Sequence, residues 1–169
     1  MLVLVLSIQK IIINFLHYIF LNVKAPHRCY VENITEYGSR LIQIIQFRIE
    51  NKPQAVHDWI VDRETNHIYA VTQLYPFNKE RNGFATQIVK FNLPSINIPQ
   101  VILSDVDIED SFEVFFPHIL QGGVIHNHTL YFPSGASADS QLQYGKEKAI
   151  VIIDLKEKKI KRIIDVQDI

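Results

Sequence analysis

The sequence has a single cysteine and almost no net charge. With Cys29 as its only thiol, the chain has no internal disulfide and no zinc site built from cysteine thiolates. Its 17 basic residues nearly balance 18 acidic ones, and they are scattered apart from a basic run at 156–162, predicted as the exposed tip of a hairpin. No other segment supplies the one-sided basic surface that nucleic acid phosphates require. Disulfide-stabilised, thiolate-zinc and nucleic-acid-binding proteins are therefore excluded.

Alanine and methionine are also scarce, whereas isoleucine, valine, phenylalanine and tyrosine are abundant. Because β-branched and aromatic residues favour strands, this balance predicts an all-β fold. The hydrophobic fraction of 47% and the charged fraction of 21% are typical of a globular protein rather than a disordered one. A chain of 169 residues is long enough for one ordinary domain with a sizeable core. No helix is expected in residues 28–169.

The N-terminal segment 1–25 differs in amino-acid composition from the rest of the chain. Its stretch Leu2–Val23 is mostly apolar, but polar residues interrupt it at Gln9, Lys10, Asn14, His17 and Asn22. It is long enough for a transmembrane helix, which needs about 20 residues. However, Lys10 near the middle of the stretch would cost about 2.5–3.5 kcal/mol on insertion.

Three interpretations of this segment stay open. The first is a membrane-directed segment, either an anchor or a signal peptide, although a basic start is missing and Pro26 disfavours cleavage after Ala25. The second is the remnant of an ordinary strand, and the third is a genuine buried element. Export or membrane association, with membrane contact through Leu2–Val23, is an expectation of the first interpretation only.

The rest of the chain contains a repeat of short strands. Three pairs of residues recur at a spacing of 62: Tyr69 with Tyr131, Ile88 with Ile150, and Leu93 with Leu155. The repeat divides residues 28–169 into a half unit at 28–49 and two full units at 56–110 and 118–169. Since the spacing recurs in both hairpins of a unit, it indicates equivalent structures rather than a local coincidence.

Each full unit is predicted to contain four strands joined by turns and one longer loop. In the first unit the strands are expected at 59–61, 68–72, 87–91 and 101–103, with a loop at 74–85 and an acidic loop at 104–113. In the second unit they are expected at 124–125, 130–132, 150–154 and 160–166, with a turn at Asn127 and a polar loop at 134–148.

Four short strands at a period near 60 are typical of a β-propeller blade. A four-stranded sheet cannot cover either of its faces alone, so neighbouring sheets stack around an axis. The alternative is an open β-sandwich, which also uses short strands at regular spacing. We expect β-propeller-like antiparallel blades, about two and a half of them, in an incomplete ring.

Residues 28–169 resemble uncharacterised bacterial six-bladed β-propeller proteins of the glutamine-cyclotransferase-like superfamily, many of them exported. The resemblance rests on the stretches 29–34, 41–45, 58–62, 68–69, 120–123, 130–131 and 151–155. These stretches mark the fold rather than an activity, and fold analogy does not transfer chemistry. Because a closed ring has about four to eight blades, the resemblance implies a partial chain, by truncation, self-association or an open arrangement.

Four residues are candidates for a ligand site. His57, Asp58 and His118 stand just before an innermost strand, and Gln121 precedes two glycines. In a propeller these positions line the central funnel, where small ligands bind. A histidine and an aspartate are suited to general acid-base catalysis, but adjacent residues on a strand point to opposite faces. Structural hydrogen bonding of strand ends, and close backbone approach at Gly122-Gly123, are the plainer interpretations.

Other chemistry-bearing residues have weaker patterns. His126 and His128 have a spacing usable for a metal but flank a predicted turn, and the acidic residues Asp105, Asp107, Glu109 and Asp110 lack the glycine and final glutamate of a calcium loop. Ser134 is not in the strand-nucleophile-helix context of a hydrolase. Trp59 is expected to pack between sheets. The sequence predicts no metal, no cofactor and no catalytic residue.

Two functions follow from these patterns. The first is a non-enzymatic binding or scaffold module that presents its loops to a protein, peptide or glycan, or that self-associates through open blade faces. The second is part of a propeller enzyme, cyclotransferase-like or hydrolase-like, with its site in the central funnel. The second function requires a complete ring, because several blades contribute to such a site.

Overall fold

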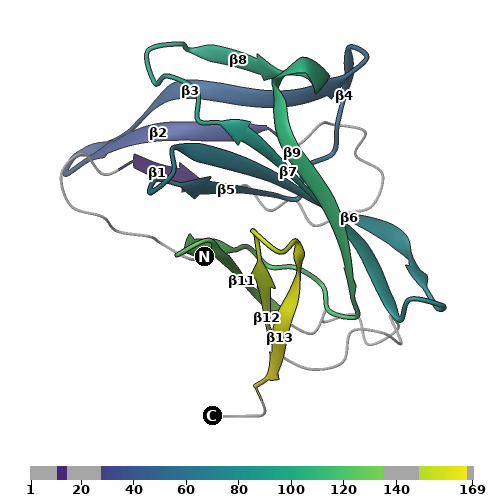
Figure 1. Cartoon of the computed structure of the whole chain (residues 1–169). Coiled ribbons are helices and arrows are strands. Elements are labelled where there is room, and N and C mark those ends of the chain that lie inside the picture. Colours follow the sequence, from purple (N-terminus) through teal and green to yellow (C-terminus); the bar gives the residue numbers. More distant parts are fainter. Residues whose placement is uncertain (1–10, 15–27, 135–148, 167–169) are drawn as a thin grey trace. The chain divides into compact units, whose positions relative to one another are not determined.

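The computed structural model describes residues 11–14, 28–134 and 149–166 (Figure 1). These residues form three sheets of about four strands each, antiparallel except for one parallel pair of strands, and one short 3₁₀ helix at Asp105–Asp107. The all-β prediction is confirmed, and no closed propeller is present in the described residues. No helix in this part of the chain has the length and apolar character needed to cross a membrane.

The chain divides into two compact units, and the first comprises Met1–Val56 and Pro94–Asp107. Its sheet has the order β1-β2-β3-β4, and one further strand, β8, pairs with β3 in parallel. The strands are β1 (Ile11–Asn14), β2 (Cys29–Thr35), β3 (Gly38–Ile49), β4 (Lys52–Pro53) and β8 (Gln100–Leu103). The pattern of the half unit 28–49 predicts strands at 29–34 and 41–49 joined by a turn at 35–39, and the β2–β3 hairpin agrees with this prediction. Strand β1 lies in the apolar N-terminal segment and pairs with β2, whereas the rest of segment 1–25 lies outside the described residues.

The second unit comprises His57–Leu93 and Ile108–Ile169, and it contains two four-stranded antiparallel sheets. The first of them, sheet C, runs in the order β5 (Asp58–Asp62), β6 (His67–Asn78), β7 (Gly83–Asn92) and β9 (Ile108–Phe116). The β6–β7 hairpin projects past the end of β5, because β5 pairs only with residues 67–71 of β6 (Figure 1).

The second sheet of this unit, sheet D, has the order β10 (Val124–His126), β11 (Thr129–Ser134), β12 (Ala149–Asp154) and β13 (Lys159–Asp165). The turn between β10 and β11 consists of Asn127 and His128, with φ of 48° and 56°. Two residues of positive φ form the type I′ turn that matches the twist of a tight hairpin. All four strands and this turn agree with the sequence prediction for 118–169.

Sheets C and D pack face to face around one hydrophobic core. Sheet C contributes Ile60, Tyr69, Val71, Ile88, Val114 and Phe116, sheet D contributes Leu130, Phe132, Val151 and Ile153, and Leu120 comes from the connection. The core residues alternate with more exposed ones along β12, as expected when one face of a strand is buried. Apolar burial stabilises the stack by roughly 25 cal/mol for each Å² removed from water.

The prediction for the fourth strand of unit 56–110 is wrong. Residues 101–103 belong to β8, which pairs with β3 within the first compact unit. The fourth strand of sheet C is β9. Most of β9 had been assigned to an acidic loop at 104–113. The acidic residues of β9 favoured a loop in the sequence analysis. The strand nevertheless alternates between buried and exposed positions, because Val114 and Phe116 are buried and their neighbours are exposed or partly exposed.

The loop predicted at 74–85 is also wrong in its extent. Strand β6 continues to Asn78 and β7 begins at Gly83, so only a short turn separates them. Pro76 and the turn-forming residues around Asn78 favoured a loop on local grounds. A register irregularity between Leu74 and Asn78 accommodates this part of β6 within the sheet.

We predict that Gly83→Ala destabilises the second unit by about 1–3 kcal/mol, the usual cost of overpacking a core. A Cβ atom at position 83 would lie 2.5 Å from the backbone nitrogen of Phe116, a residue whose side chain is fully buried. Urea unfolding measures the change. The control is Lys79→Ala at an exposed position of the same turn, for which a change within about 0.5 kcal/mol is expected. Equal stabilities of the two variants would contradict the close packing.

Candidate functional site

The structure brings the four predicted site residues to one end of the sheet stack. His57 accepts a hydrogen bond at Nδ1 from the backbone nitrogen of Gln73 (2.9 Å). The carboxylate of Asp58, which is buried, accepts one from the backbone nitrogen of Gly122 (3.3 Å). His57, Asp58 and Gly122 are therefore close together in the second unit, and the ligand role expected for the candidate residues stays a prediction.

His118 and Gln121 take part through their backbone groups. The carbonyl oxygen of His118 accepts a hydrogen bond from Nε2 of Gln73 (2.8 Å). The backbone nitrogen of Gln121 donates to the carbonyl oxygen of Pro133 (3.2 Å). These contacts attach the connection between β9 and β10 to both sheets. They are structural hydrogen bonds, the alternative to a ligand role for these residues.

Gln73 is the residue that sequence reasoning missed at this end. Its side chain is 3% exposed and bridges the connection, since Nε2 donates to His118 and Oε1 accepts from the backbone nitrogen of Leu120 (3.4 Å). A glutamine two positions after the core residue Val71 was the available signal, because it places a polar side chain on the buried face of β6. Buried polar groups of this kind require partners, and here they have them.

The two glycines of the connection have different physical roles. Gly122 adopts a φ of +93°, a conformation that other residues rarely adopt. A Cβ atom at Gly123 would lie 2.7 Å from Cδ1 of Ile60 and 2.8 Å from Cε1 of Phe132. The absence of a side chain at Gly123 therefore allows the connection to approach the core between the sheets.

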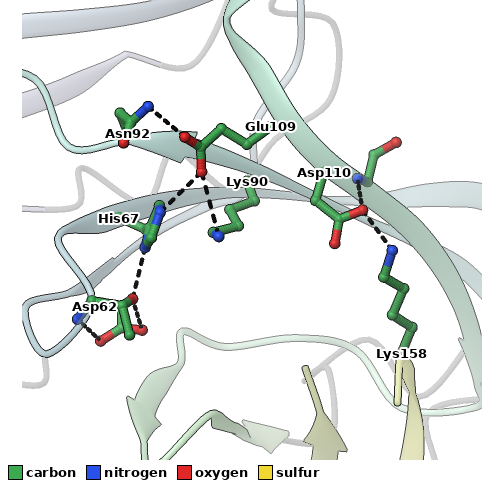
Figure 2. A network of polar contacts seen from close by, with 9 residues as sticks. Asp62, His67, Lys90, Asn92, Glu109, Asp110 and Lys158 are labelled. Atoms are coloured by element: carbon green, nitrogen blue, oxygen red, sulfur yellow. Dashed lines mark hydrogen bonds and ion pairs between the residues drawn. The ribbon is translucent and has the colours of Figure 1, made fainter. Parts of the chain in front are cut away.

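The opposite end of the stack carries a network of charged side chains (Figure 2). Glu109 is its centre, because its carboxylate accepts a hydrogen bond from Asn92 and pairs with Nε2 of His67 (2.9 Å) and with Nζ of Lys90 (3.4 Å). The neighbouring Asp110 pairs with Nζ of Lys158 (2.6 Å), so it links sheet C to the turn between β12 and β13.

A β-bulge in β9 brings the carboxylates of Glu109 and Asp110 to the same face of sheet C. Lys90 pairs with Asp110 and Phe91 pairs with Ile108, so Glu109 is the extra residue of β9. A bulge redirects a side chain that would otherwise point to the opposite face of the sheet. Glu109 and Asp110 consequently both reach groups on the same side, although they are adjacent in the sequence.

His67 joins this network to the turn between β5 and β6. The hydroxyl of Thr65 donates to Asp62 (2.5 Å), and His67 Nδ1 lies 2.7 Å from the same hydroxyl oxygen. His67 Nε2 lies 2.9 Å from the carboxylate of Glu109. Both ring nitrogens therefore have polar partners, one in the turn after β5 and one on β9.

Two pKa values at this end depart from their ordinary ranges. Partial burial acts to raise the pKa of Glu109, but the hydrogen bond from Lys90 and the charge of His67 outweigh it, so the pKa lies below 4.5. Burial, reinforced by the carboxylates of Asp62, Asp110 and Glu109, raises the pKa of Tyr69 to about 12. Glu109 is thus held ionised and the Tyr69 phenol is held neutral.

Beside this network lies a cleft of about 230 Å³ within the second unit. Its lining comes from β6, β7 and β9 of sheet C and from the two turns of sheet D, and consists of Tyr69, Lys90, Asp110, Phe112, His128, Leu155 and Lys156. The cleft is therefore lined by apolar side chains and by charged or polar ones, and we call the second group, Lys90, Asp110, His128 and Lys156, its rim.

The other candidate residues are dispersed. His126 pairs with Glu64 (3.3 Å) at an exposed position, whereas His128 lines the cleft. Asp107 accepts hydrogen bonds from Ser104 at the 3₁₀ helix. In the part of the chain that the structure describes, no group of three or more His, Cys, Asp or Glu side chains could hold a metal ion. Trp59 is buried at 2% exposure, and among the described residues its Nε1 has no hydrogen-bond partner.

We predict that Gln73→Ala lowers the free energy of unfolding by about 1–3 kcal/mol, because it leaves buried backbone groups of His118 and Leu120 unpaired. Chemical unfolding followed by tryptophan fluorescence measures the loss. The matched control is Gln87→Ala on β7, whose side chain is exposed and which should change stability by less than about 0.5 kcal/mol. A loss at Gln87 as large as the loss at Gln73 would contradict the bridging role.

A second prediction concerns pH. Because the pKa of folded Glu109 is lowered, its stabilising contribution is present above 4.5 and is lost as the pH falls through the lower folded value. Glu109→Gln should therefore reduce stability at neutral pH and flatten the loss of stability on acidification below 4.5. Urea unfolding at a series of pH values measures both. Glu113→Gln, at an exposed position of the same strand, should keep the wild-type pH profile, and identical profiles for both variants would refute this prediction.

Comparison with known proteins adds no assignment to this geometry. No protein-family model matches the chain, and no curated protein matches it. Any function of the chain must therefore be argued from the two ends of the sheet stack and from the faces of its sheets.

Proposed function

We propose that this chain is a non-enzymatic binding or scaffold module, related to the six-bladed β-propeller proteins of glutamine-cyclotransferase-like type. In this proposal sheets C and D correspond to consecutive blades. Both are four-stranded and antiparallel in sequential strand order, and the chain passes from the last strand of sheet C to the first strand of sheet D. Such a connection is typical of neighbouring propeller blades.

The observation that carries the proposal is an apolar sheet face that occurs twice. Tyr69 and Ile88 belong to the face of sheet C that packs on sheet D. Their counterparts 62 residues later, Tyr131 and Ile150, alternate with the buried core residues of β11 and β12, and both are partly exposed. Because successive residues of a strand point to opposite faces, these counterparts lie on the outer face of sheet D.

The composition of β12 supports the same conclusion. Ala149–Ile153 is apolar at every position, so both faces of this strand carry apolar side chains. Continuous apolar strands are typical of sheets that are covered on both faces. Ile152 lies opposite Tyr131 and enlarges the apolar outer face. The outer face of sheet D is therefore suited to stack against another protein sheet, as its inner face does.

We take a second copy of this chain as the partner. It presents the same apolar face, and an interface between identical faces closes by two-fold symmetry. The net charge of −1 opposes such an association only weakly, since long-range repulsion between two copies is small. The scaffold function would then consist of holding two copies, and the loops they carry, in a defined pair.

The alternative function, part of a cyclotransferase-like or hydrolase-like enzyme with its site in the central funnel, has less support. Nδ1 of His57 is occupied by a backbone hydrogen bond, and Asp58 is buried against Gly122. The side chains that would supply acid-base chemistry thus have structural partners. Alanine at His57 and at His118 would abolish turnover if the enzyme hypothesis were correct.

Sedimentation velocity over a wide range of protein concentration tests the proposal. We expect the wild-type chain to sediment increasingly as a dimer as concentration rises, and Ile152→Lys to remain monomeric, because a buried unpaired charge at the interface costs several kcal/mol. Circular dichroism shows whether the variant keeps its β structure.

Glu157→Lys is the matched control, since it introduces the same side chain at an exposed turn of sheet D. It should dimerise as the wild type does. A wild-type chain that stays monomeric at every concentration, or a control that dissociates like Ile152→Lys, would overturn the proposal.

A further inference from the structure

The cleft beside the Glu109 network is separate from the outer face of sheet D, and charged side chains contribute to its lining. Tyr69 and Phe112 from sheet C, together with Leu155 from the turn after β12, make its apolar lining. The volume of about 230 Å³ equals the share of roughly seven or eight molecules of liquid water. A small organic molecule, rather than a macromolecule, fits such a space.

The charges of the rim do not cancel. Lys90 is paired with Glu109 (3.4 Å), and Asp110 is paired with Lys158 (2.6 Å). Within the described part of the chain, by contrast, the side chain of Lys156 makes no hydrogen bond or ion pair, and neither does the ring of His128. One ammonium group and one imidazole that can donate are therefore left over at the rim.

The wall that carries these two donors is held in place by the backbone. The carbonyl oxygen of His128 accepts a hydrogen bond from the backbone nitrogen of Leu155 (3.0 Å), which joins the two turns of sheet D. The backbone nitrogen of Lys156 donates to the carboxylate of Asp154 (2.9 Å). The backbone at both residues is thus held by hydrogen bonds.

Tyr69 adds a neutral hydrogen-bond donor to the lining. Its phenol pKa is raised to about 12, mainly by burial, so the hydroxyl keeps its proton at physiological pH. A buried phenol with a retained proton can donate to an anion without repelling it.

We propose that this cleft binds a small organic carboxylate, with the carboxylate at Lys156 and His128 and the apolar body against Tyr69, Phe112 and Leu155. Charge-assisted hydrogen bonds to a carboxylate are stronger than neutral ones, so Lys156 provides most of the selectivity for an anion. The apolar lining favours a carboxylate with a ring or short hydrocarbon body over an inorganic anion. Binding at this site does not depend on stacking at the outer face of sheet D.

Titration of the isotopically labelled full chain with benzoate, followed by NMR, tests the proposal. Saturable shifts are expected at the amides of Phe112, Leu155 and Lys156. Benzyl alcohol, which has the same ring without the charge, should give no saturable shifts at these amides. Inorganic phosphate, a charge without the ring, should bind at least about tenfold more weakly than benzoate.

Two charge-removing variants complete the test. Lys156→Gln should weaken benzoate binding at least about tenfold, the loss expected for one charge-assisted hydrogen bond. Lys161→Gln removes the same charge from an exposed position on β13 that does not line the cleft, and it should bind benzoate as the wild type does. The proposal is overturned if benzoate gives no saturable shifts, if benzyl alcohol matches it, or if the two variants weaken binding equally.

Discussion

The second unit depends on the packing of two four-stranded sheets against each other. Neither sheet can bury its apolar face alone, and the shared core contains fully buried side chains from both, including Ile88 from sheet C and Leu130, Phe132 and Val151 from sheet D. The close packing extends to the connection between the sheets, where Gly123 leaves room for Ile60 and Phe132.

Polar groups close the stack at both of its ends, and they do so in different ways. At one end the interactions are buried and mostly involve the backbone, with Gln73 and Asp58 holding the connection that leads to β10. At the other end they are ion pairs around Glu109 and Asp110, which are partly exposed. Buried polar groups are costly unless paired, whereas partly exposed charges stay available to solvent and ligands. The carboxylate-binding cleft that we propose lies at the second end.

The repeat of 62 residues connects the core to the proposed function. It relates Tyr69 and Ile88, which are in the core, to Tyr131 and Ile150, which are on the outer face of sheet D. The inner face of one sheet is thus repeated on the outer face of the next. This relation accounts for the apolar residues on both faces of β12, and it supports the proposal that another sheet stacks on the outer face of sheet D.

The sequence by itself determined the all-β class, the β2–β3 hairpin and the whole of sheet D, because alternation and tight turns are local properties. It named His57, Asp58, His118 and Gln121 as candidate ligand residues, a role that stays a prediction. Only the tertiary structure decided that β8 pairs with β3, that β9 completes sheet C, and that the bulge at Glu109 brings His67, Lys90 and Asn92 to one carboxylate. These outcomes depend on pairing between residues far apart in the chain, and the local pattern of a single strand does not specify its partner.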